Sequence, residues 1–201
     1  MTAIIDYYFA PISGYAYLGH EALLKISRDT GAELRHHPMG CEPAFPTNTE
    51  RLGFCLAEQR RKHRADEQRI WAERRNLPMR TEPAHWPTDP HLACRVILAA
   101  RELGVDVGDV TATCLRGVWV EERNIADPSD LGEALLSNGL PGRALISMAY
   151  SEPIRDRAQA VHSAAIDAGV IGSPTYCVDG TWFRGQDQID RLRAMLIRDA
   201  A

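Results

Sequence analysis

The sequence predicts an α/β fold with the element order β-α-β, a long helical block and then α-β-β-α. Three observations support this prediction: a β-branched and aromatic run that opens the chain, a helix-prone middle, and an Asp-Gly dipeptide between two β-prone runs near the end. The chain has 201 residues, of which 45% are hydrophobic. It is therefore long enough for one globular domain that carries a large insertion.

The first elements are a strand, a tight turn and a helix. Residues 3–9, with the sequence AIIDYYF, predict a strand, and Ser13 and Gly14 lie in the turn that follows it. The apolar spacing after this turn predicts a helix that begins at Ser13 and ends at Gly31. Residues 32–37 predict a second strand.

The sequence of the middle of the chain predicts helices and no strands. Residues 49–75 are charged and helix-prone. Asp89-Pro90 and Asp127-Pro128 each place an N-cap residue before a proline at the first helical position, so each pair predicts the start of a helix.

The last part of the chain returns to strands. A helix over residues 152–168 precedes the hairpin TYCV-DG-TWFR at residues 175–184, and a final helix covers residues 187–199. We therefore expect one α/β domain from residues 1–38 and 152–201, with residues 39–151 as a helical insertion.

Composition and charge narrow the class of function. The net charge of -4 argues against a nucleic-acid binder, so a small molecule is the expected partner. No window approaches the roughly 18 uninterrupted apolar residues of a membrane span, and the N-terminus lacks a signal-peptide pattern, so we expect a cytoplasmic protein with no membrane partner. The cysteines form no C-x-x-C pair and the histidines no H-x-x-x-H pair, so neither a disulfide framework nor a metal site is expected.

Motifs along the whole chain resemble a known family. IDYYFAPISGYAYLG near the start, KHRADEQRIWAERRNLP and VWVEERNIADP in the middle, and GVIGSPTYCVDGTWFRGQDQIDRL near the end are similar to 2-hydroxychromene-2-carboxylate isomerases and to the related kappa-class glutathione transferases. This resemblance implies a thioredoxin-like fold with a cis-proline, Pro174, at the start of the first hairpin strand. It also implies glutathione as the cofactor, a small aromatic substrate and a homodimer.

Ser13 aligns with the serine that this family carries where disulfide oxidoreductases have their attacking cysteine, so the resemblance implies that its hydroxyl assists the thiol of glutathione. A thiol with a pKa of about 8.5 is only roughly 3% ionised at pH 7, and lowering that pKa by about two units requires about 2.7 kcal/mol. A helix N-terminus usually contributes only about 0.3–1 kcal/mol. A hydroxyl hydrogen bond to the charged sulfur adds roughly 1.5–3 kcal/mol. The alternative is that Ser13 serves only as an N-cap.

The resemblance also implies binding residues beyond Ser13. The backbone of Ser173 would pair with the cysteinyl part of glutathione as an added strand would, and the start of the last helix would hold the γ-glutamyl end. The implied glutathione contacts are Ser173, Pro174, Gln186, Asp187 and Lys62, and the implied substrate contacts are Asn48 and Asp89. Structural alternatives remain: a strand-initial proline for Pro174, N-caps for Asp187 and Asp89, and a solvated charge run around Lys62.

The chain departs from the family pattern near the expected site. Relatives often carry proline and serine where this chain has Gly14 and Ala16, an aspartate in place of Ala10, and a bulkier apolar residue in place of Ser173. We expect Gly14 to loosen the start of the first helix.

Three classes of function follow from these observations. The preferred one is a glutathione-dependent cis/trans isomerase of an aromatic unsaturated 2-oxo acid, of the type that converts 2-hydroxychromene-2-carboxylate to trans-o-hydroxybenzylidenepyruvate. The second is a kappa-class-like glutathione transferase or peroxidase. The third is a thiol–disulfide oxidoreductase or a non-catalytic binding protein, and the oxidoreductase is disfavoured because Ser13 and Ala16 leave no cysteine at the helix start.

Overall fold

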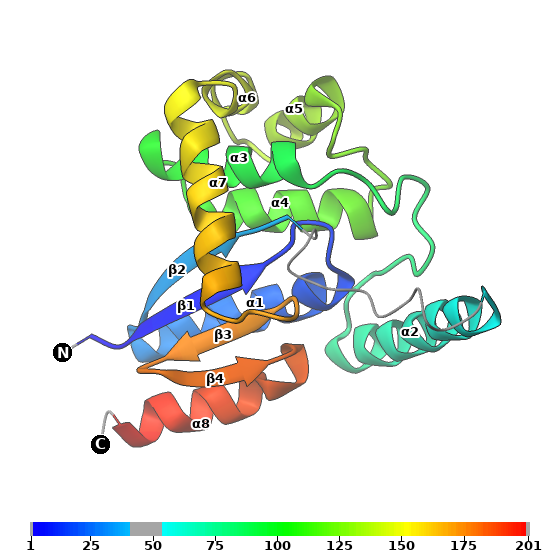
Figure 1. Ribbon diagram of the computed structural model, residues 1–201, viewed down its shortest axis with the longest axis vertical. Coiled ribbons are helices and arrows are strands. Elements are labelled where there is room, and N and C mark those ends of the chain that lie inside the picture. The colour runs from blue at the N-terminus through cyan, green and yellow to red at the C-terminus, as the bar shows by residue number, and fades with distance from the viewer. Residues whose placement is uncertain (1, 41–53, 200–201) are drawn as a thin grey trace.

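The computed structural model describes residues 2–40 and 54–199, in which helices surround a four-stranded sheet (Figure 1). The strand order is β2-β1-β3-β4. β1 pairs in parallel with β2 and antiparallel with β3, and β3 pairs antiparallel with β4. The strands are β1 (Ile4–Phe9), β2 (Glu33–Pro38), β3 (Thr175–Val178) and β4 (Thr181–Arg184).

Helices occupy most of the described chain between β2 and β3. The helices are α1 (Gly14–Thr30), α2 (Phe54–Arg75), α3 (His91–Glu102), α4 (Val107–Trp119), α5 (Pro128–Ser137), α6 (Gly142–Ala149), α7 (Glu152–Asp167) and α8 (Ile189–Asp199), with a 3-10 turn, η2 (Gln186–Gln188), before α8. The sequence predicts a helical middle but not α4 and α6 as separate helices, because neither begins with the Asp-Pro pair that marks α5. None of the helices described is both long enough and apolar enough to span a membrane.

Local signals define both ends of α1. Ser13 is its N-cap, and the Oγ atom of Ser13 accepts a hydrogen bond from the Ala16 N–H at 3.2 Å. Gly31 is its C-cap with a φ of 69°, a left-handed conformation that glycine adopts without a steric penalty. Both predicted ends of this helix are confirmed.

The predicted hairpin is also confirmed. Asp179 and Gly180 connect β3 to β4, and both have positive φ values, 47° and 77°. Positive φ at both central residues is the requirement of a type I′ turn, which explains why Asp-Gly is a strong hairpin signal.

The two faces of the sheet differ in burial. Ile5, Tyr7 and Phe9 of β1 are fully buried because alternate side chains of a strand point to the same face. This face belongs to the main hydrophobic core, to which α1 and α8 also contribute. α7 crosses the other face, where Ala165 lies in a small apolar cluster with Tyr8, and Figure 1 shows α7 in front of the strands with α1 behind them.

The register of the sheet brings three distant segments to one edge. Phe9, at the end of β1, lies opposite Pro38, at the end of β2. Tyr8 pairs with Thr175, the first residue of β3, and Thr175 pairs with Arg184, the last residue of β4. The turn after β1, the turn before β3 and the turn after β4 therefore lie together, and α1 begins directly after the first of them.

Candidate active site

Ser13 and Ser173 meet at this edge of the sheet. The Ser13 hydroxyl donates a hydrogen bond to the Ser173 carbonyl oxygen at 3.1 Å, and the Ser173 Oγ atom accepts one from the Ala10 N–H at 2.9 Å. The peptide bond between Ser173 and Pro174 is cis, as the resemblance implies. Ser13 remains partly exposed, so its side chain lies at the surface where α1 begins.

The Ser13 hydroxyl already has two partners. Its oxygen accepts from the Ala16 N–H while its hydrogen points to the Ser173 carbonyl. A hydroxyl has a single hydrogen, so Ser13 must release the Ser173 carbonyl before it can donate to a ligand. The oxygen can keep capping α1 during this change, which means that the N-cap role and a ligand-binding role are compatible.

The turn before β3 is joined to the turn after β4. The Gly185 N–H donates a hydrogen bond to the Pro174 carbonyl at 2.8 Å. Gln186 lies against α1, because a Cβ atom added at Gly19 would be 3.0 Å from the Cβ of Gln186. Gly19 is about 9 Å along the helix from Ser13, and an extended tripeptide spans roughly 10 Å. The distance between Ser13 and this turn therefore suits a ligand of tripeptide length.

Gln186 and Asp187 differ in exposure. Gln186 is only 2% exposed, and its backbone carbonyl accepts a hydrogen bond from the Nη2 atom of Arg75 at 3.0 Å. Asp187 is exposed, and its Oδ2 atom accepts from the Gln188 side chain at 2.7 Å. Asp187 is not an N-cap, because it lies inside a 3-10 turn whose N-cap is Gly185. Its carboxylate can therefore meet a ligand, whereas the Gln186 side chain is buried.

Helix α2 packs against the start of α1. The Tyr15 hydroxyl donates a hydrogen bond to Glu67 at 2.7 Å. A Cβ atom at Gly14 would collide with the buried side chain of Gln68 and would lie 2.9 Å from the Met79 Cε atom. The missing side chain lets α2 approach α1 closely, so packing as well as helix propensity bears on Gly14, and the looser helix start stays a prediction.

Replacing Gly14 with alanine should therefore destabilise the protein. We expect a loss of about 1 kcal/mol in the free energy of unfolding, the low end of the usual cost of overpacking, because the colliding atoms are the ends of the Gln68 and Met79 side chains. The matched control is Gly132→Ala in α5, where an added Cβ would meet only the Ile146 Cγ1 atom at an ordinary 3.6 Å. Urea unfolding of both variants tests this account, and equal stability of the two would contradict it.

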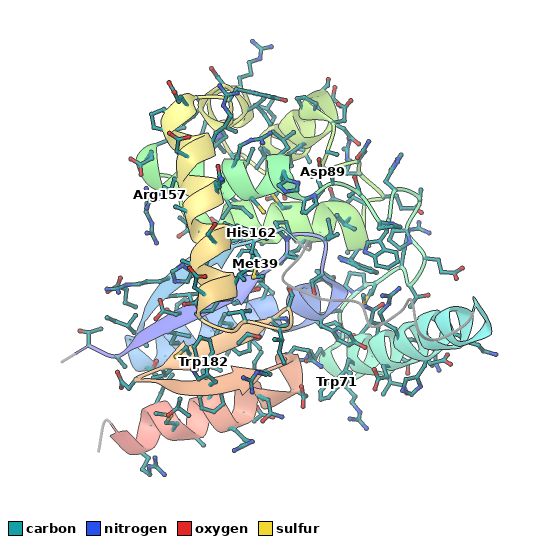
Figure 2. The ribbon with its side chains drawn as sticks, in the orientation of Figure 1. Met39, Trp71, Asp89, Arg157, His162 and Trp182 are labelled. Atoms are coloured by element: carbon teal, nitrogen blue, oxygen red, sulfur yellow. The ribbon has the colours of Figure 1, made fainter. Side chains whose placement is uncertain are left out.

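Two of the predicted binding residues, Lys62 and Asp89, are not joined to Ser13 by any contact described. Lys62 is exposed on α2, and no contact described for it reaches Ser13. Asn48 lies outside the described residues. Asp89 precedes α3 (Figure 2), and its Oδ1 atom accepts from the N–H and the Nδ1 atom of His91 at 2.8 and 2.5 Å. The prediction that Asp89 is the N-cap of this helix is wrong, because Pro90 holds that position. The Asp89 carboxylate bonds to His91 from one residue before the N-cap.

The hydrogen bonds of Asp89 also affect its ionisation. Partial burial acts to raise the pKa of Asp89, but the hydrogen bonds and the charge of His91 outweigh this effect and hold the pKa below its ordinary value. Asp89 is therefore an anion that already has a partner. Whether it also contacts a substrate stays a prediction.

Sequence reasoning missed Trp86 as a neighbour of the site. Its Nε1 atom donates a hydrogen bond to the carbonyl of Ile12, the residue before Ser13, at 3.2 Å. The Arg64 guanidinium lies 4.3 Å from the centre of the Trp86 ring, and the Trp119 ring centre lies 5.9 Å away. Trp86 is visible in the sequence as an aromatic beside a proline, but its contact with Ile12 spans 74 residues and has no local signal.

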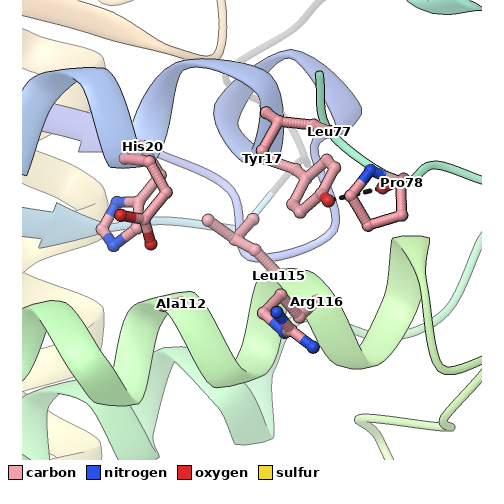
Figure 3. Close-up of a pocket in the computed structure, with 8 residues that line it drawn as sticks. Tyr17, His20, Leu77, Pro78, Ala112, Leu115 and Arg116 are labelled. Carbon is pink, nitrogen blue, oxygen red and sulfur yellow. Dashed lines mark hydrogen bonds between the residues drawn. The ribbon is translucent and has the colours of Figure 1, made fainter. Parts of the chain in front are cut away.

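A cavity of about 140 Å³ lies between α1 and α4 (Figure 3). Tyr17, His20 and Arg116 are among its lining residues, and the Tyr17 hydroxyl donates a hydrogen bond to the Pro78 carbonyl at 2.5 Å. Ser13 and Ser173 are not among the lining residues described. The cavity is therefore separate from the edge of the sheet where these two serines meet.

Two histidines lie in the core beside β1. The Nε2 atom of His20 lies 3.0 Å from the Gly108 carbonyl, and Nε2 carries the hydrogen because a carbonyl only accepts. Burial lowers the pKa of His20 and lowers that of His36 to about 3, so both are neutral. His37 points to the opposite face, as strand alternation predicts, and pairs with Asp6 at 2.7 Å.

The fold and this edge of the sheet are those of a thioredoxin-like protein. The family model of the DSBA-like thioredoxin domain matches residues 4–196, and the chain belongs to this family. The chain is 28% identical to a 2-hydroxychromene-2-carboxylate isomerase from Sphingobium xenophagum over 210 aligned residues, which cover 98% of this chain and 100% of that protein. The predicted thioredoxin-like fold is therefore confirmed.

Solved structures agree with this assignment. A selenomethionine structure of 2-hydroxychromene-2-carboxylate isomerase has a TM-score of 0.79 and 19% identity, with 98% of this chain and 96% of that chain covered. The cytosolic disulfide reductase DsbM from Pseudomonas aeruginosa, also solved with GSH, has a TM-score of 0.68 and 20% identity, with 98% of each chain covered. At these identities, the two structures establish the fold that the chain shares with them.

Proposed function

We propose that this protein is a glutathione-dependent cis/trans isomerase of an aromatic unsaturated 2-oxo acid. The observation that carries the proposal is the position of the Ser13 hydroxyl, at the N-terminus of α1 and beside the Ser173-Pro174 turn. A helix N-terminus and a hydroxyl donor are the two contributions that together can hold a thiol as a thiolate. The full-length similarity to a 2-hydroxychromene-2-carboxylate isomerase supports this substrate class.

The residues at this edge fit glutathione. Ser13 offers a hydroxyl to the sulfur, and the exposed Asp187 carboxylate suits the ammonium of the γ-glutamyl end. When bound, glutathione would supply a thiolate that adds reversibly to the conjugated double bond, which can rotate before the sulfur leaves again. The protein's own task is to hold the sulfur in its ionised form and to orient both ends of the peptide.

Ser13 performs this task by changing its hydrogen-bond partner. Its hydrogen leaves the Ser173 carbonyl for the sulfur, while its oxygen continues to cap α1. The lost bond to the carbonyl is worth about 0.5–1.5 kcal/mol and the bond to a charged sulfur about 1.5–3 kcal/mol, so the exchange is favourable. The cysteinyl N–H of glutathione can then donate to the Ser173 carbonyl, as an added strand would, which recovers the lost bond.

The test is to incubate the purified protein with 2-hydroxychromene-2-carboxylate, with and without glutathione, and to follow formation of the ring-opened isomer. We expect conversion that depends on glutathione and leaves its concentration unchanged. The absence of glutathione-stimulated conversion would contradict the proposal. Consumption of glutathione in step with turnover would instead favour the kappa-class-like transferase.

The thiol–disulfide oxidoreductase alternative agrees with the family but not with the residues. Such an enzyme needs an attacking cysteine at the start of α1, where this chain has Ser13 and Ala16. Cys94 and Cys114 are buried, and Cys177 lies on β3. The homodimer and the cytoplasmic location remain predictions from the resemblance and from the sequence.

A further inference from the structure

Arg75 joins α2 to the turn after β4. Its Nη2 atom donates a hydrogen bond to the Gln186 carbonyl at 3.0 Å, a contact that spans 111 residues. Its guanidinium also lies 5.4 Å from the centre of the ring of Trp71, the α2 residue labelled in Figure 2. The last turn of α2 therefore holds a cation against the turn that we assign to the γ-glutamyl end of glutathione.

Polar groups around this turn lack partners within the described chain. The Nε atom of Arg75 is buried and has no acceptor there. The Oε1 atom of Gln186 and the hydroxyl of Tyr176 are also buried without a partner among the described residues. Buried polar groups are almost always hydrogen-bonded, so the half-buried Arg75, unlike the enclosed side chains of Gln186 and Tyr176, keeps a donor that a ligand at this turn can use.

Charges of both signs surround the turn without pairing. Burial lowers the pKa of Arg75, whereas Tyr176, Asp190 and Asp187 act in the opposite direction, so the two carboxylates lie within electrostatic range of the guanidinium. Among the described residues, no ion pair joins Arg75 to either carboxylate, and Asp187 instead accepts from Gln188. An amino acid carries a carboxylate and an ammonium on one carbon atom. The Arg75 cation can pair with such a carboxylate and the Asp187 anion with such an ammonium.

We propose that Arg75 binds the α-carboxylate of the γ-glutamyl group of glutathione, beside the ammonium that the proposed function already assigns to Asp187. The proposal rests on the glutathione site described above and deepens it, because it names the residue that distinguishes glutathione from thiols without a γ-glutamyl group. A guanidinium has five N–H donors in a planar fork that fits a carboxylate. The Gln186 carbonyl uses one of these donors.

Calorimetric titration with glutathione, γ-glutamylcysteine and cysteinylglycine tests this assignment in the wild type, Arg75→Gln and Arg74→Gln. Arg74 is a matched control because it is exposed and lies 5.3 Å from the same Trp71 ring. We expect Arg75→Gln to bind the two γ-glutamyl thiols roughly tenfold to a hundredfold more weakly, the range for one charge-assisted hydrogen bond. Its affinity for cysteinylglycine, and all affinities of Arg74→Gln, should match the wild type.

The outcomes separate this proposal from the proposed function. Wild-type protein that binds none of the three thiols would overturn the glutathione site itself. Wild-type binding that Arg75→Gln leaves unchanged, or an equal loss for cysteinylglycine, would overturn only the role of Arg75. Melting temperatures report whether each variant folds. If Arg75→Gln does not fold, Arg75→Lys keeps the charge without the fork, and its affinity should fall for the γ-glutamyl thiols only.

Discussion

Replacing Ser13 with alanine is expected to lower the isomerase activity at neutral pH roughly threefold to twenty-five-fold, in proportion to the ionised fraction of the thiol. The alanine removes a hydrogen bond to the charged sulfur that is worth about 1.5–3 kcal/mol, and each 1.36 kcal/mol corresponds to one pKa unit. The N-terminus of α1 remains, but its contribution of about 0.3–1 kcal/mol is too small to ionise the thiol alone. The pKa of bound glutathione should therefore rise by about one to two units. A pH titration of the ultraviolet absorbance of the thiolate measures this shift.

Two variants at Ser13 separate this role from helix capping. Alanine at an N-cap costs about 0.5–2 kcal/mol of stability, whereas glycine costs only a few tenths. Ser13→Gly should therefore keep nearly all of the stability and lose activity as the alanine variant does. Ser13→Thr keeps both the hydroxyl and the cap and should stay active. If the glycine and alanine variants ionise the thiol as well as the wild type, Ser13 is only an N-cap.

The parts of the site that local signals define could be predicted from the sequence. Ser13 precedes a helical pattern that closes at Gly31, and Asp179-Gly180 marks the hairpin. The register of four short strands then brings the turn after β1 and the turn before β3 to one edge. Local signals thus predict the strand-turn-helix and the hairpin, whereas the resemblance, not these signals, implies that Ser13 and Pro174 belong to one site.

The contacts between the helical block and this edge could not be predicted. Trp86 reaches Ile12, and Arg75 reaches Gln186, across 74 and 111 residues. Hydrophobic periodicity shows that α2 is a helix, but it does not show which residue of α1 or of the turn after β4 that helix meets. Gly14 is an example, because helix propensity treats it as destabilising and gives no sign that the side chains of Gln68 and Met79 pack where its own side chain would be.

Acidification is expected to destabilise the protein through His36. Burial and the neighbouring His20, Arg101 and His37 lower the pKa of His36 in the folded protein to about 3, whereas an unfolded histidine has a pKa near 6.5. Between these values, the unfolded chain binds a proton that the native protein does not. The free energy of unfolding should therefore fall by about 1.4 kcal/mol per pH unit as the pH drops below about 6.5, with no contribution above it.

Urea unfolding from about pH 7.5 to about pH 4.5 measures this dependence. At about pH 4.5, two units below the pKa of an unfolded histidine, His36 alone should have lowered the free energy of unfolding by about 2.7 kcal/mol. Because carboxylates also titrate in this range, the informative quantity is the difference in slope between the wild type and His36→Leu. That variant should lose the slope of one proton, whereas His85→Leu, at an exposed histidine, should keep the wild-type slope. Coinciding slopes for the wild type and His36→Leu would mean that His36 is not neutral in the fold.

This acid sensitivity must be separated from the ionisation of the thiol. Activity should fall on acidification for two reasons, because the bound thiolate becomes protonated and because the folded protein loses stability. Ser13→Thr retains the hydroxyl that stabilises the thiolate, and His36→Leu removes the buried imidazole without touching Ser13. If both accounts hold, the His36→Leu variant keeps the wild-type pH dependence of thiolate absorbance while its unfolding becomes less sensitive to acid. Both groups therefore act on the acid limb of the same pH profile, and the two measurements separate their contributions.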